Sequence, residues 1–354
     1  MHASGFLAYQ LARTAGGGGY RGHGPKVKRG NEILDGPYPK SFTQFVGQTT
    51  ARSQILAAIT ASVVLHQPMD HMLLASGQAG VGKTALARLT AFKLDAGMVE
   101  LSGLVNDKDA AKALKVMRDG DVLLIDEIHR LVGHGKSRAE WLLTLLQDGE
   151  LHMPTGVVIA PKITVIAATT DKERLPQTIL DRFTIQPILE PYSLDEGVEI
   201  AKLQATRLGF GTELLPMPAN DDWLRAAAHA ARHNPRRIGK LLSSVRDVAL
   251  STKGANLHGD AGYDITMALE WNGLTQDGIT RCGQDYLLGL LAYGGTAGLP
   301  TLKALLNEEL LVQTERDLIQ DGYVEVTPRG RTLTDYGNDR AIQLATNKME
   351  ATAS

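Results

Sequence analysis

The sequence predicts an α/β nucleotide-binding domain, followed by a helical region and a small winged helix near the C-terminal end. Three observations predict this order. Apolar segments of strand length alternate with helical patterns up to about residue 190, and a glycine-rich loop joins one such segment to a helix. From residue 195 onward the pattern is helical, and it closes with three helices and a hairpin.

The glycine-rich loop fits the phosphate-binding pattern G-x-x-x-x-G-K-[ST] at every fixed position. Residues 71–76 before the loop predict a buried strand, and residues 84–92 after it predict a helix, which argues against a chance glycine turn. We expect the loop to bind the phosphates of ATP, and the threonine hydroxyl to bind Mg²⁺. The candidate residues are Gly77, Gly80, Val81, Gly82, Lys83, Thr84 and Ala85.

Length and composition describe a globular protein of a reducing compartment. The 354 residues are enough for two or three domains, and hydrophobic and charged contents of 43% and 21% are typical of globular chains. The single cysteine, Cys282, excludes an internal disulfide and a cysteine metal cage, which favours the cytoplasm. A formal net charge of -2 argues against a DNA-coating protein, and no apolar run predicts a membrane span.

Residues 1–35 predict a flexible, glycine-rich and basic extension. Residues 16–19 are four glycines, and no acidic residue precedes Glu32. A basic arm on DNA and a transit peptide share this composition and remain alternatives. Beyond the extension, Phe45 and Val46 either belong to the core or line an adenine pocket, which is usually apolar.

The second strong motif is a buried strand that ends in two carboxylates, over residues 121–127. We expect Asp126 to hold Mg²⁺ and Glu127 to orient and deprotonate the attacking water. The alternative is a strand ending in a solvated acidic turn, which the intact phosphate loop upstream disfavours. His129 follows at once, and we expect a structural or surface role for it. A helix is expected next, over residues 138–148.

Further candidates lie near the end of this domain. Residues 150–159 predict a short hairpin, and residues 163–170 predict a buried strand that ends in Thr169 and Thr170. A hydroxyl there can sense the γ-phosphate, although threonine is also common at strand ends for its β-propensity. Arg182 is a candidate arginine finger for a neighbouring subunit, or an ordinary surface charge.

The second half of the chain carries two further groups of candidate residues. Arg236, near a helix start, points into a nucleotide cleft or into solvent. Residues 322–326 and 331–334 predict the hairpin of a winged helix, whose tip carries Arg329 and Arg331 either on DNA phosphates or in an ordinary charged turn. The expected helices cover residues 201–208, 223–232, 238–250, 264–271, 286–292, 299–306 and 312–320.

Taken in order, these motifs resemble those of the RuvB family, the bacterial ATPase motors that drive Holliday-junction branch migration. The resemblance runs from about Pro39 to about Gly337. The most specific parts are the Asp-Glu-Ile-His-Arg run that begins at Asp126 and the Thr-Pro-Arg-Gly-Arg run that begins at Thr327. The phosphate loop, Ala168-Thr169-Thr170, Asp181-Arg182-Phe183 and Pro235-Arg236 appear in the order of the family.

The resemblance implies an AAA+ P-loop NTPase core with a helical lid domain and a C-terminal winged-helix domain. The implied boundaries are 1–35 for the extension, 36–190 for the core, 191–272 for the lid, 273–340 for the winged helix and 341–354 for a tail.

The resemblance also assigns roles to single residues. It implies that Arg182 is an arginine finger, that Tyr192 lines the nucleotide site and that Arg236 is the sensor arginine of the lid. Thr170, or its neighbour Thr169, would be the other sensor. Implied cofactors and partners are ATP, Mg²⁺, DNA as a four-way junction or duplex, and five further copies in a hexameric ring.

The sequence departs from the family pattern at four places. Tyr38, Leu180 and Val326 stand where the family usually has basic residues, and the segment 147–161 is shorter than in the family. That segment resembles the hairpin that docks the partner RuvA, so recruitment of a RuvA-type partner is less firmly implied. A clamp-loader-like or helicase-loader-like ATP switch is the second hypothesis. A DNA-binding regulator with a vestigial ATPase is the third, which the intact Lys83 disfavours.

Overall fold

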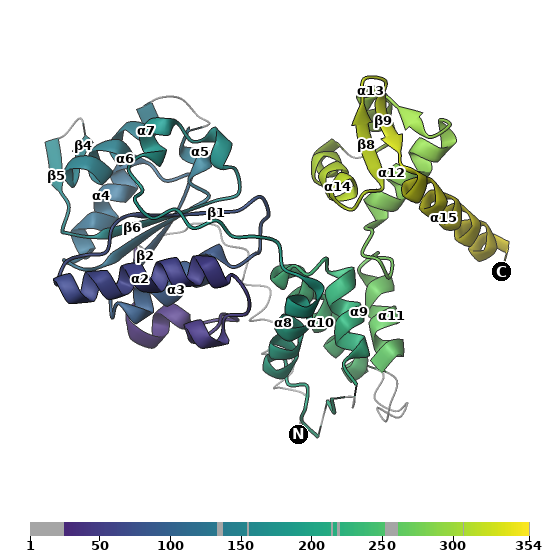
Figure 1. Cartoon of the computed structure of the whole chain (residues 1–354), viewed down its shortest axis with the longest axis horizontal. Helices are drawn as coiled ribbons and strands as arrows, with labels where there is room; N and C mark the ends of the chain where they lie inside the picture. The colour runs from purple at the N-terminus through teal and green to yellow at the C-terminus, as the bar shows by residue number, and fades with distance from the viewer. Residues whose placement is uncertain are drawn as a thin grey trace, which may run out of the picture. The chain divides into compact units, whose positions relative to one another are not determined.

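The computed structural model describes residues 25–132, 137–153, 156–213, 215–217, 220–251, 261–306 and 308–353. The chain forms two compact units that divide between Glu190 and Pro191 (Figure 1). Most of the expected N-terminal extension, residues 1–24, lies outside the described residues.

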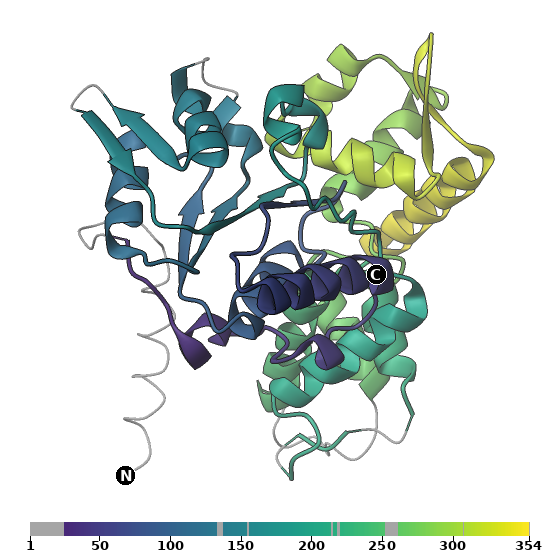
Figure 2. The ribbon, with the colours of Figure 1, turned by 60° about the vertical axis from the view of Figure 1, so that its left-hand side comes forward.

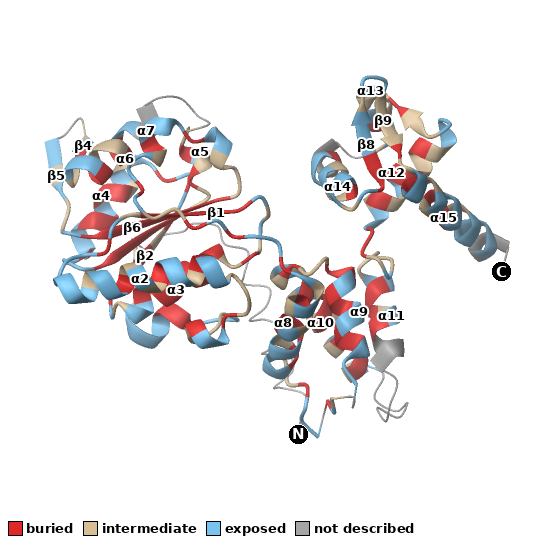
Figure 3. Cartoon of the chain, viewed as in Figure 1, coloured by how far each residue is buried: buried red, intermediate tan, exposed pale blue. Residues whose placement is uncertain are grey.

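A parallel sheet forms the centre of the first unit. Its spatial order is β1-β6-β3-β2. The inner strands β3 and β6 are almost wholly apolar, as expected for strands covered on both faces, and Figure 3 shows the sheet as a buried layer. The strands are β1 (Met72–Ala75), β2 (Met98–Ser102), β3 (Val122–Asp126) and β6 (Thr164–Thr169).

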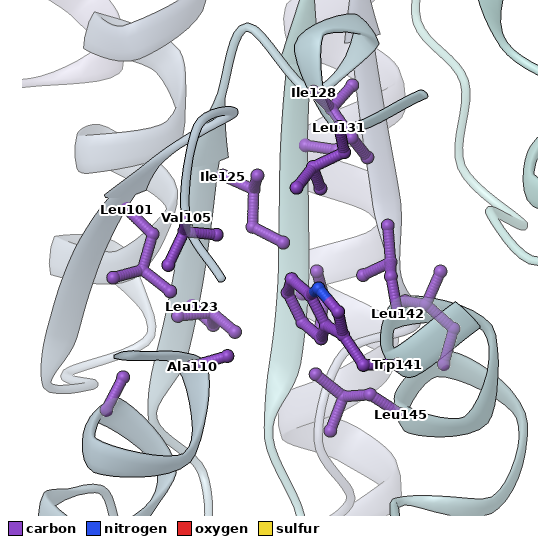
Figure 4. Close-up of a cluster of buried hydrophobic side chains, with 14 of the residues drawn as sticks. Leu101, Val105, Ala110, Leu123, Ile125, Ile128, Leu131, Trp141, Leu142 and Leu145 are labelled. Carbon is purple, nitrogen blue, oxygen red and sulfur yellow. The ribbon is translucent and has the colours of Figure 1, made fainter. Parts of the chain in front are cut away.

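Helices cover both faces of this sheet, with α2 and α3 on one side and α5 and α6 on the other (Figure 1). On the second side, Trp141, Leu142 and Leu145 of α6 pack against the strand residues Leu123 and Ile125 (Figure 4). The helices are α2 (Thr49–Leu65), α3 (Lys83–Lys93), α4 (Asp107–Val116), α5 (His129–Val132), α6 (Ser137–Asp148) and α7 (Gln177–Leu180). Short 3-10 turns occur at η2 (Phe42–Gln44) and η3 (Lys172–Arg174).

The expected hairpin is present as β4 (Glu150–Met153) and β5 (Gly156–Ile159), paired antiparallel. Figures 1 and 2 show it at the edge of the first unit. Val157 and Ile159 are 55% and 79% exposed, so this hairpin presents apolar side chains to its surroundings.

Irregular segments cover both edges of the parallel sheet. Ile185 and Ile188 form parallel bridges to β1, and Lys28 forms an antiparallel bridge to Met98 of β2. Backbone hydrogen bonds of 2.9 and 2.8 Å connect Lys28 and Met98 in both directions. These contacts satisfy edge groups that would otherwise be open to pairing with another chain.

The residues just after the glycine-rich run are packed, although the sequence predicts a flexible extension up to residue 35. Arg29 makes two hydrogen bonds of 3.0 and 2.9 Å to the carboxylate of Asp121, whose side chain is 3% exposed. The turn η1 (Gly30–Leu34) buries Ile33 and Leu34 against α3. A buried carboxylate is stabilised by a cationic partner, and burial of two apolar side chains adds further stabilisation. Together these contacts hold this segment against the first unit.

The first part of the second unit is a helical bundle. It contains α8 (Leu194–Arg207), α9 (Asp222–Ala230), α10 (Pro235–Ser251) and α11 (Ala261–Trp271). A capping box starts α8, because the Ser193 hydroxyl accepts from the Glu196 N–H while the Glu196 carboxylate accepts from the Ser193 N–H. The apolar faces of α9 and α10 form the core, with Trp223, Leu224 and Leu241 buried.

The last part of the second unit is a winged helix with its own core around Tyr286, Leu290 and Leu318. Its elements are α12 (Arg281–Ala292), β7 (Thr296–Ala297), α13 (Leu299–Leu305), α14 (Glu308–Gln320), β8 (Val324–Thr327) and β9 (Gly330–Leu333). The final helix, α15 (Asp335–Ala353), continues through most of the residues that the sequence assigns to a tail. No helix among the described residues is both long enough and apolar enough to cross a membrane.

Candidate nucleotide-binding and hydrolysis site

The sheet topology brings three motifs to one edge. The phosphate loop follows β1, the two threonines end β6, and the two carboxylates end β3, and these strands are neighbours in the order β1-β6-β3. Because the strands are parallel, their carboxyl ends lie together, which is where α/β sheets bind ligands. Residues separated by about ninety positions in sequence therefore meet.

The phosphate loop has the backbone that its glycines allow. Gly80 and Gly82 have φ values of +85° and +107°, a region that favours glycine. Lys83 is the first residue of α3, and its side chain is 6% exposed. Its Nζ lies 2.7 Å from the Ser76 hydroxyl and 3.2 Å from the Gln78 carbonyl oxygen. A buried ammonium at a helix N-terminus is suited to binding phosphate oxygens.

The neighbouring Thr84 and Asp126 form a pair of oxygen ligands. The Thr84 hydroxyl donates to Asp126 Oδ2 at 3.3 Å, and the Glu127 N–H donates to Asp126 Oδ1 at 3.0 Å. Hard oxygen donors beside a phosphate site fit Mg²⁺, which in such sites takes one or two protein ligands and completes its shell with phosphate and water. The described residues contain no group of three or more His, Cys, Asp or Glu side chains that would form an all-protein metal cage.

Glu127 is held by both its backbone and its carboxylate. Its φ is +54°, and its carbonyl oxygen lies so close to Gly103 that an added Cβ there would stand 2.0 Å away. Its Oε2 accepts a 3.2 Å hydrogen bond from the Thr170 hydroxyl and lies 3.4 Å from Nε2 of His129. A left-handed backbone is uncommon in a residue other than glycine, and here it sets the direction in which the chain leaves β3.

The two threonines at the end of β6 have different environments, which the sequence left open. Thr169 is fully buried, and its hydroxyl accepts from the Asp171 N–H at 3.0 Å and lies 3.0 Å from Nδ1 of His129. Thr170 is half-buried and contacts Glu127. Thr170 therefore faces the carboxylate directly, while Thr169 reaches it only through His129.

The candidate adenine segment is fastened to the end of the first unit by a residue that sequence reasoning missed. Gln48 makes two hydrogen bonds to the backbone of Glu190, one of 2.7 Å from Nε2 and one of 3.1 Å to Oε1. Phe45 is 4% exposed, and Val46 is half-buried. The burial of Phe45 suits a core residue and an adenine pocket equally. A glutamine side chain that satisfies a distant backbone has no signal in a single sequence.

Three further candidate residues come from later parts of the chain. Arg182 is exposed, and its guanidinium donates to Oε1 of Gln147 at 2.7 Å. Tyr192 and Arg236 belong to the second unit. The Tyr192 ring is buried, its carbonyl oxygen lies 3.2 Å from Nδ1 of His233, and the Arg236 side chain is exposed.

The turn before α10 is unusual because it has two successive left-handed residues, Arg232 and His233, each with a φ of +54°. The Asn234 side chain then caps the helix by accepting from the N–H groups of Arg236 and Arg237 at 3.1 and 3.3 Å. Two strained residues followed by a strong cap fix the direction in which α10 starts.

This turn is also joined to the winged helix by ion pairs. Arg232 contacts Asp317 at 3.3 Å and Asp321 at 2.7 Å, and Arg237 contacts Asp317 at 2.8 Å. Burial, despite the nearby Arg232, raises the pKa of the Asp321 carboxyl above its usual value. Arg236, the candidate sensor, therefore lies one residue before an arginine bound to α14.

The two arginines of the wing have different surroundings. Arg329 is exposed at the turn between β8 and β9. Arg331 makes two hydrogen bonds of 3.0 and 2.9 Å to the carboxylate of Glu315, which also accepts from the Tyr286 hydroxyl at 3.0 Å. Burial acts against it, but the hydrogen bonds from Arg331 and Tyr286 lower the pKa of Glu315. The Arg331 side chain is thus occupied by its ion pair with Glu315, whereas the Arg329 side chain is exposed to solvent.

The chain is similar to proteins of one family over most of its length. The family model for the Holliday junction DNA helicase RuvB P-loop domain matches residues 38–189, and that for the RuvB C-terminal winged helix domain matches residues 276–340. The Holliday junction branch migration complex subunit RuvB of Lacticaseibacillus casei is 32% identical over 317 residues, which are 84% of this chain and 89% of that protein. Its counterpart in Lacticaseibacillus paracasei has the same identity and coverage.

Solved structures give the same similarity. The Thermotoga maritima RuvB Holliday junction branch migration motor is 28% identical, with a TM-score of 0.71 over 85% of this chain and 97% of that one. A mutant of the same Thermotoga maritima protein has a TM-score of 0.72 at 28% identity, over 86% and 98% of the two chains.

Proposed function

The chain belongs to the RuvB family of Holliday junction branch migration ATPases, and from that premise we propose that it hydrolyses ATP to translocate branched or duplex DNA. The observation that carries the proposal is the meeting of Lys83, Thr84, Asp126 and Glu127 at the carboxyl edge of the sheet. The chain also has the RuvB C-terminal winged helix, which we propose to contact DNA.

We assign phosphate binding to the loop and to Lys83. The ammonium of Lys83 exchanges its contacts with Ser76 and Gln78 for the β- and γ-phosphate oxygens. Thr84 and Asp126 are the proposed ligands of Mg²⁺. When bound, this ion neutralises charge on the β- and γ-phosphate oxygens. Phe45, Val46 and Tyr192 are proposed to surround the base of the nucleotide.

Glu127 is the proposed general base. Its carboxylate takes a proton from the attacking water, whose oxygen forms a bond to the γ-phosphorus while the bond to the β,γ-bridging oxygen breaks. ADP and inorganic phosphate leave, and the proton on Glu127 returns to solvent. Thr170 is the proposed sensor of the γ-phosphate, because its hydroxyl already contacts this carboxylate.

The remaining arginines are proposed to link subunits and domains. Arg182 is exposed, which suits a finger that enters the site of a neighbouring copy in a hexameric ring. Arg236 is proposed to read the nucleotide from the lid. Its neighbour Arg237 is bound to Asp317, so a change in α10 is transmitted to the winged helix, where Arg329 contacts DNA phosphate.

The proposal is tested by ATP-driven branch migration of a synthetic four-way junction with one labelled arm, using the full chain with and without a RuvA-type partner. We expect conversion to duplex products with ATP and none with a non-hydrolysable analogue. The exposed Val157 and Ile159 of the β4–β5 hairpin are the proposed contact for such a partner. Conversion that requires the partner supports the recruitment of such a partner, and conversion without it removes the need for one.

A second candidate function is an ATP switch of the clamp-loader or helicase-loader kind. It is favoured by the short hairpin, in which each strand has four residues. DNA-stimulated ATP hydrolysis without junction conversion under either condition would support this switch and contradict the motor. For either function we propose a cytoplasmic location, on the ground of the single cysteine.

A further inference from the structure

His129 lies between the proposed general base and the fully buried end of β6. Its Nε2 is 3.4 Å from Oε2 of Glu127, and its Nδ1 is 3.0 Å from Oγ1 of Thr169. The side chain is 12% exposed, and His129 is the first residue of α5, two positions after Glu127. We propose that His129 is a positioning residue that aims the Glu127 carboxylate and takes its own orientation from Thr169. The inference rests on the proposed role of Glu127.

The hydrogen-bond network assigns the protons of the imidazole. Thr169 accepts from the backbone N–H of Asp171 at 3.0 Å, and its hydroxyl has one proton left to donate. Directing this proton to Nδ1 of His129 makes Nδ1 an acceptor, so that the ring proton of a neutral imidazole is on Nε2. The opposite tautomer would turn the Nε2 lone pair toward a carboxylate, which is repulsive. The nitrogen that lies 3.4 Å from Oε2 of Glu127 is therefore the protonated one.

Among the described residues, the two side chains that contact the Glu127 carboxylate reach the same oxygen. The Thr170 hydroxyl donates to Oε2 at 3.2 Å, and His129 approaches Oε2 from its ring. This arrangement assigns Oε1 to the proton of the attacking water. The backbone of Glu127 has a φ of +54° and packs against Gly103, so rotation of the side chain is the freedom that these two contacts restrict.

A purely structural histidine would pack its ring into the core and bond to backbone. His129 instead contacts two side chains, and both come from the ends of strands that form the site. Thr169 is anchored by Asp171, in the segment that follows β6, so a shift of that segment would move the ring and, through it, the carboxylate. His129 thus connects the buried end of β6 to the catalytic base.

The test compares kcat, KM and nucleotide affinity for full-length variants. We expect His129→Ala to lower kcat about 10- to 100-fold, which is less than the loss expected when the general base itself is removed. The dissociation constant of a fluorescent ATP analogue should stay within about twofold of the wild-type value. His129→Gln keeps an N–H donor near Oε2 and should recover several-fold of the loss. The matched control is His152→Gln, because His152 lies 2.9 Å from Glu150 in an exposed pair on the hairpin.

A second pair of variants tests the path through Thr169. Thr169→Val removes the hydroxyl and should lower kcat, whereas Thr169→Ser keeps it and should not. In the His129→Ala background, Thr169→Val should add no further loss, because the ring that it orients is gone. If Thr169→Val lowers kcat in this background as much as it does in the wild-type protein, Thr169 acts independently of His129, and the proposed path from Thr169 through His129 to Glu127 is wrong.

The outcomes separate this inference from the proposed function. Normal kcat for His129→Ala, or a loss of nucleotide affinity as large as the loss of kcat, overturns the positioning role. If His129→Ala is unfolded and therefore does not bind the ATP analogue, the kcat values of His129→Gln, Thr169→Val and Thr169→Ser test the positioning role instead. If Glu127→Gln hydrolyses ATP normally, the assignment of the base fails; if it is inactive while His129→Ala is normal, only the inference about His129 fails.

Discussion

The proposed role of Glu127 as a base can be tested by a substitution that hardly changes the shape of its side chain. Glu127→Gln keeps the side-chain volume and still accepts a hydrogen bond from Thr170, but it cannot take a proton from water. We expect turnover to fall by about 10²- to 10⁴-fold while ATP binding is retained. Steady-state hydrolysis and equilibrium binding of an ATP analogue measure the two effects.

Glu150→Gln is the matched control, because Glu150 is a 40% exposed carboxylate outside the site that also contacts a histidine. The control should hydrolyse ATP at the wild-type rate. A Glu127→Gln protein that turns over normally would remove this residue from the mechanism.

Among single residues, those fixed by contiguous motifs could be predicted from the sequence. Lys83 and Thr84 follow from the loop pattern, and Asp126 and Glu127 follow from an apolar strand with an acidic end. The surroundings of Thr169 and Thr170 could not be told apart, because they depend on contacts with residues about forty positions away. The same holds for Arg331, whose partner Glu315 is on another element.

At the scale of elements, the wing gives a paired prediction for two arginines that are two residues apart. Arg329→Gln should weaken DNA binding and reduce the slope of log affinity against log salt by about 1, since one phosphate contact is lost. Arg331→Gln should instead lower the free energy of unfolding by about 1 to 3 kcal/mol, because Glu315 then loses its cationic partner. Salt-dependent DNA binding and calorimetric unfolding measure both variants, and a reversal of the two effects would contradict these roles.

The same ion pair predicts the acid sensitivity of the winged helix. The pKa of Glu315 is lowered in the folded protein, so the folded state keeps this carboxylate charged at pH values where the unfolded chain is already protonated. Its contribution is complete above the ordinary carboxyl pKa of about 4.3 and is lost as the pH falls through the lower folded-state value. Calorimetry between about pH 3 and pH 6 should show a shallower loss of stability for Arg331→Gln than for wild type. Equal slopes would contradict the linkage.

Strands and helices with a regular pattern of apolar residues could be predicted from the sequence, whereas elements whose apolar pattern is interrupted or very short could not. The buried strands β1, β3 and β6 read as apolar runs, and most helices of the second unit were expected within a few residues. The strand β2 was missed because Glu100 stands at its centre, where it pairs with Arg88 and Lys28. The two-residue β7 is recognisable only through its pairing with β9. In α15, Gly337 reads as a helix breaker, but an added Cβ there would meet the Tyr323 carbonyl oxygen at 1.9 Å.

At the scale of the whole molecule, the proposed ring makes a prediction about mixtures. Arg182→Ala should bind ATP but hydrolyse almost none, because the neighbouring site lacks its arginine. Mixed with the inactive Glu127→Gln protein, it should regain part of the wild-type rate, since some interfaces then combine an intact base with an intact arginine. Activity measured over a range of mixing ratios should rise and fall with a maximum between the pure proteins. A flat, inactive series would argue against an arginine that acts across subunits.

The covered edges of the central sheet have a consequence for how the protein behaves when it is concentrated. The Lys28–Met98 bridge closes one edge, and the segment around Ile185 and Ile188 closes the other. A chain shortened to begin at residue 38, where the family match starts, would lose Lys28 and with it this cover of β2. Its exposed strand would be a template for indiscriminate aggregation, which is most harmful in a protein proposed to gather in close-packed copies. The residues between the glycine run and the family domain thus protect the protein from aggregation. We expect a shortened chain to precipitate at concentrations at which the full chain stays in solution.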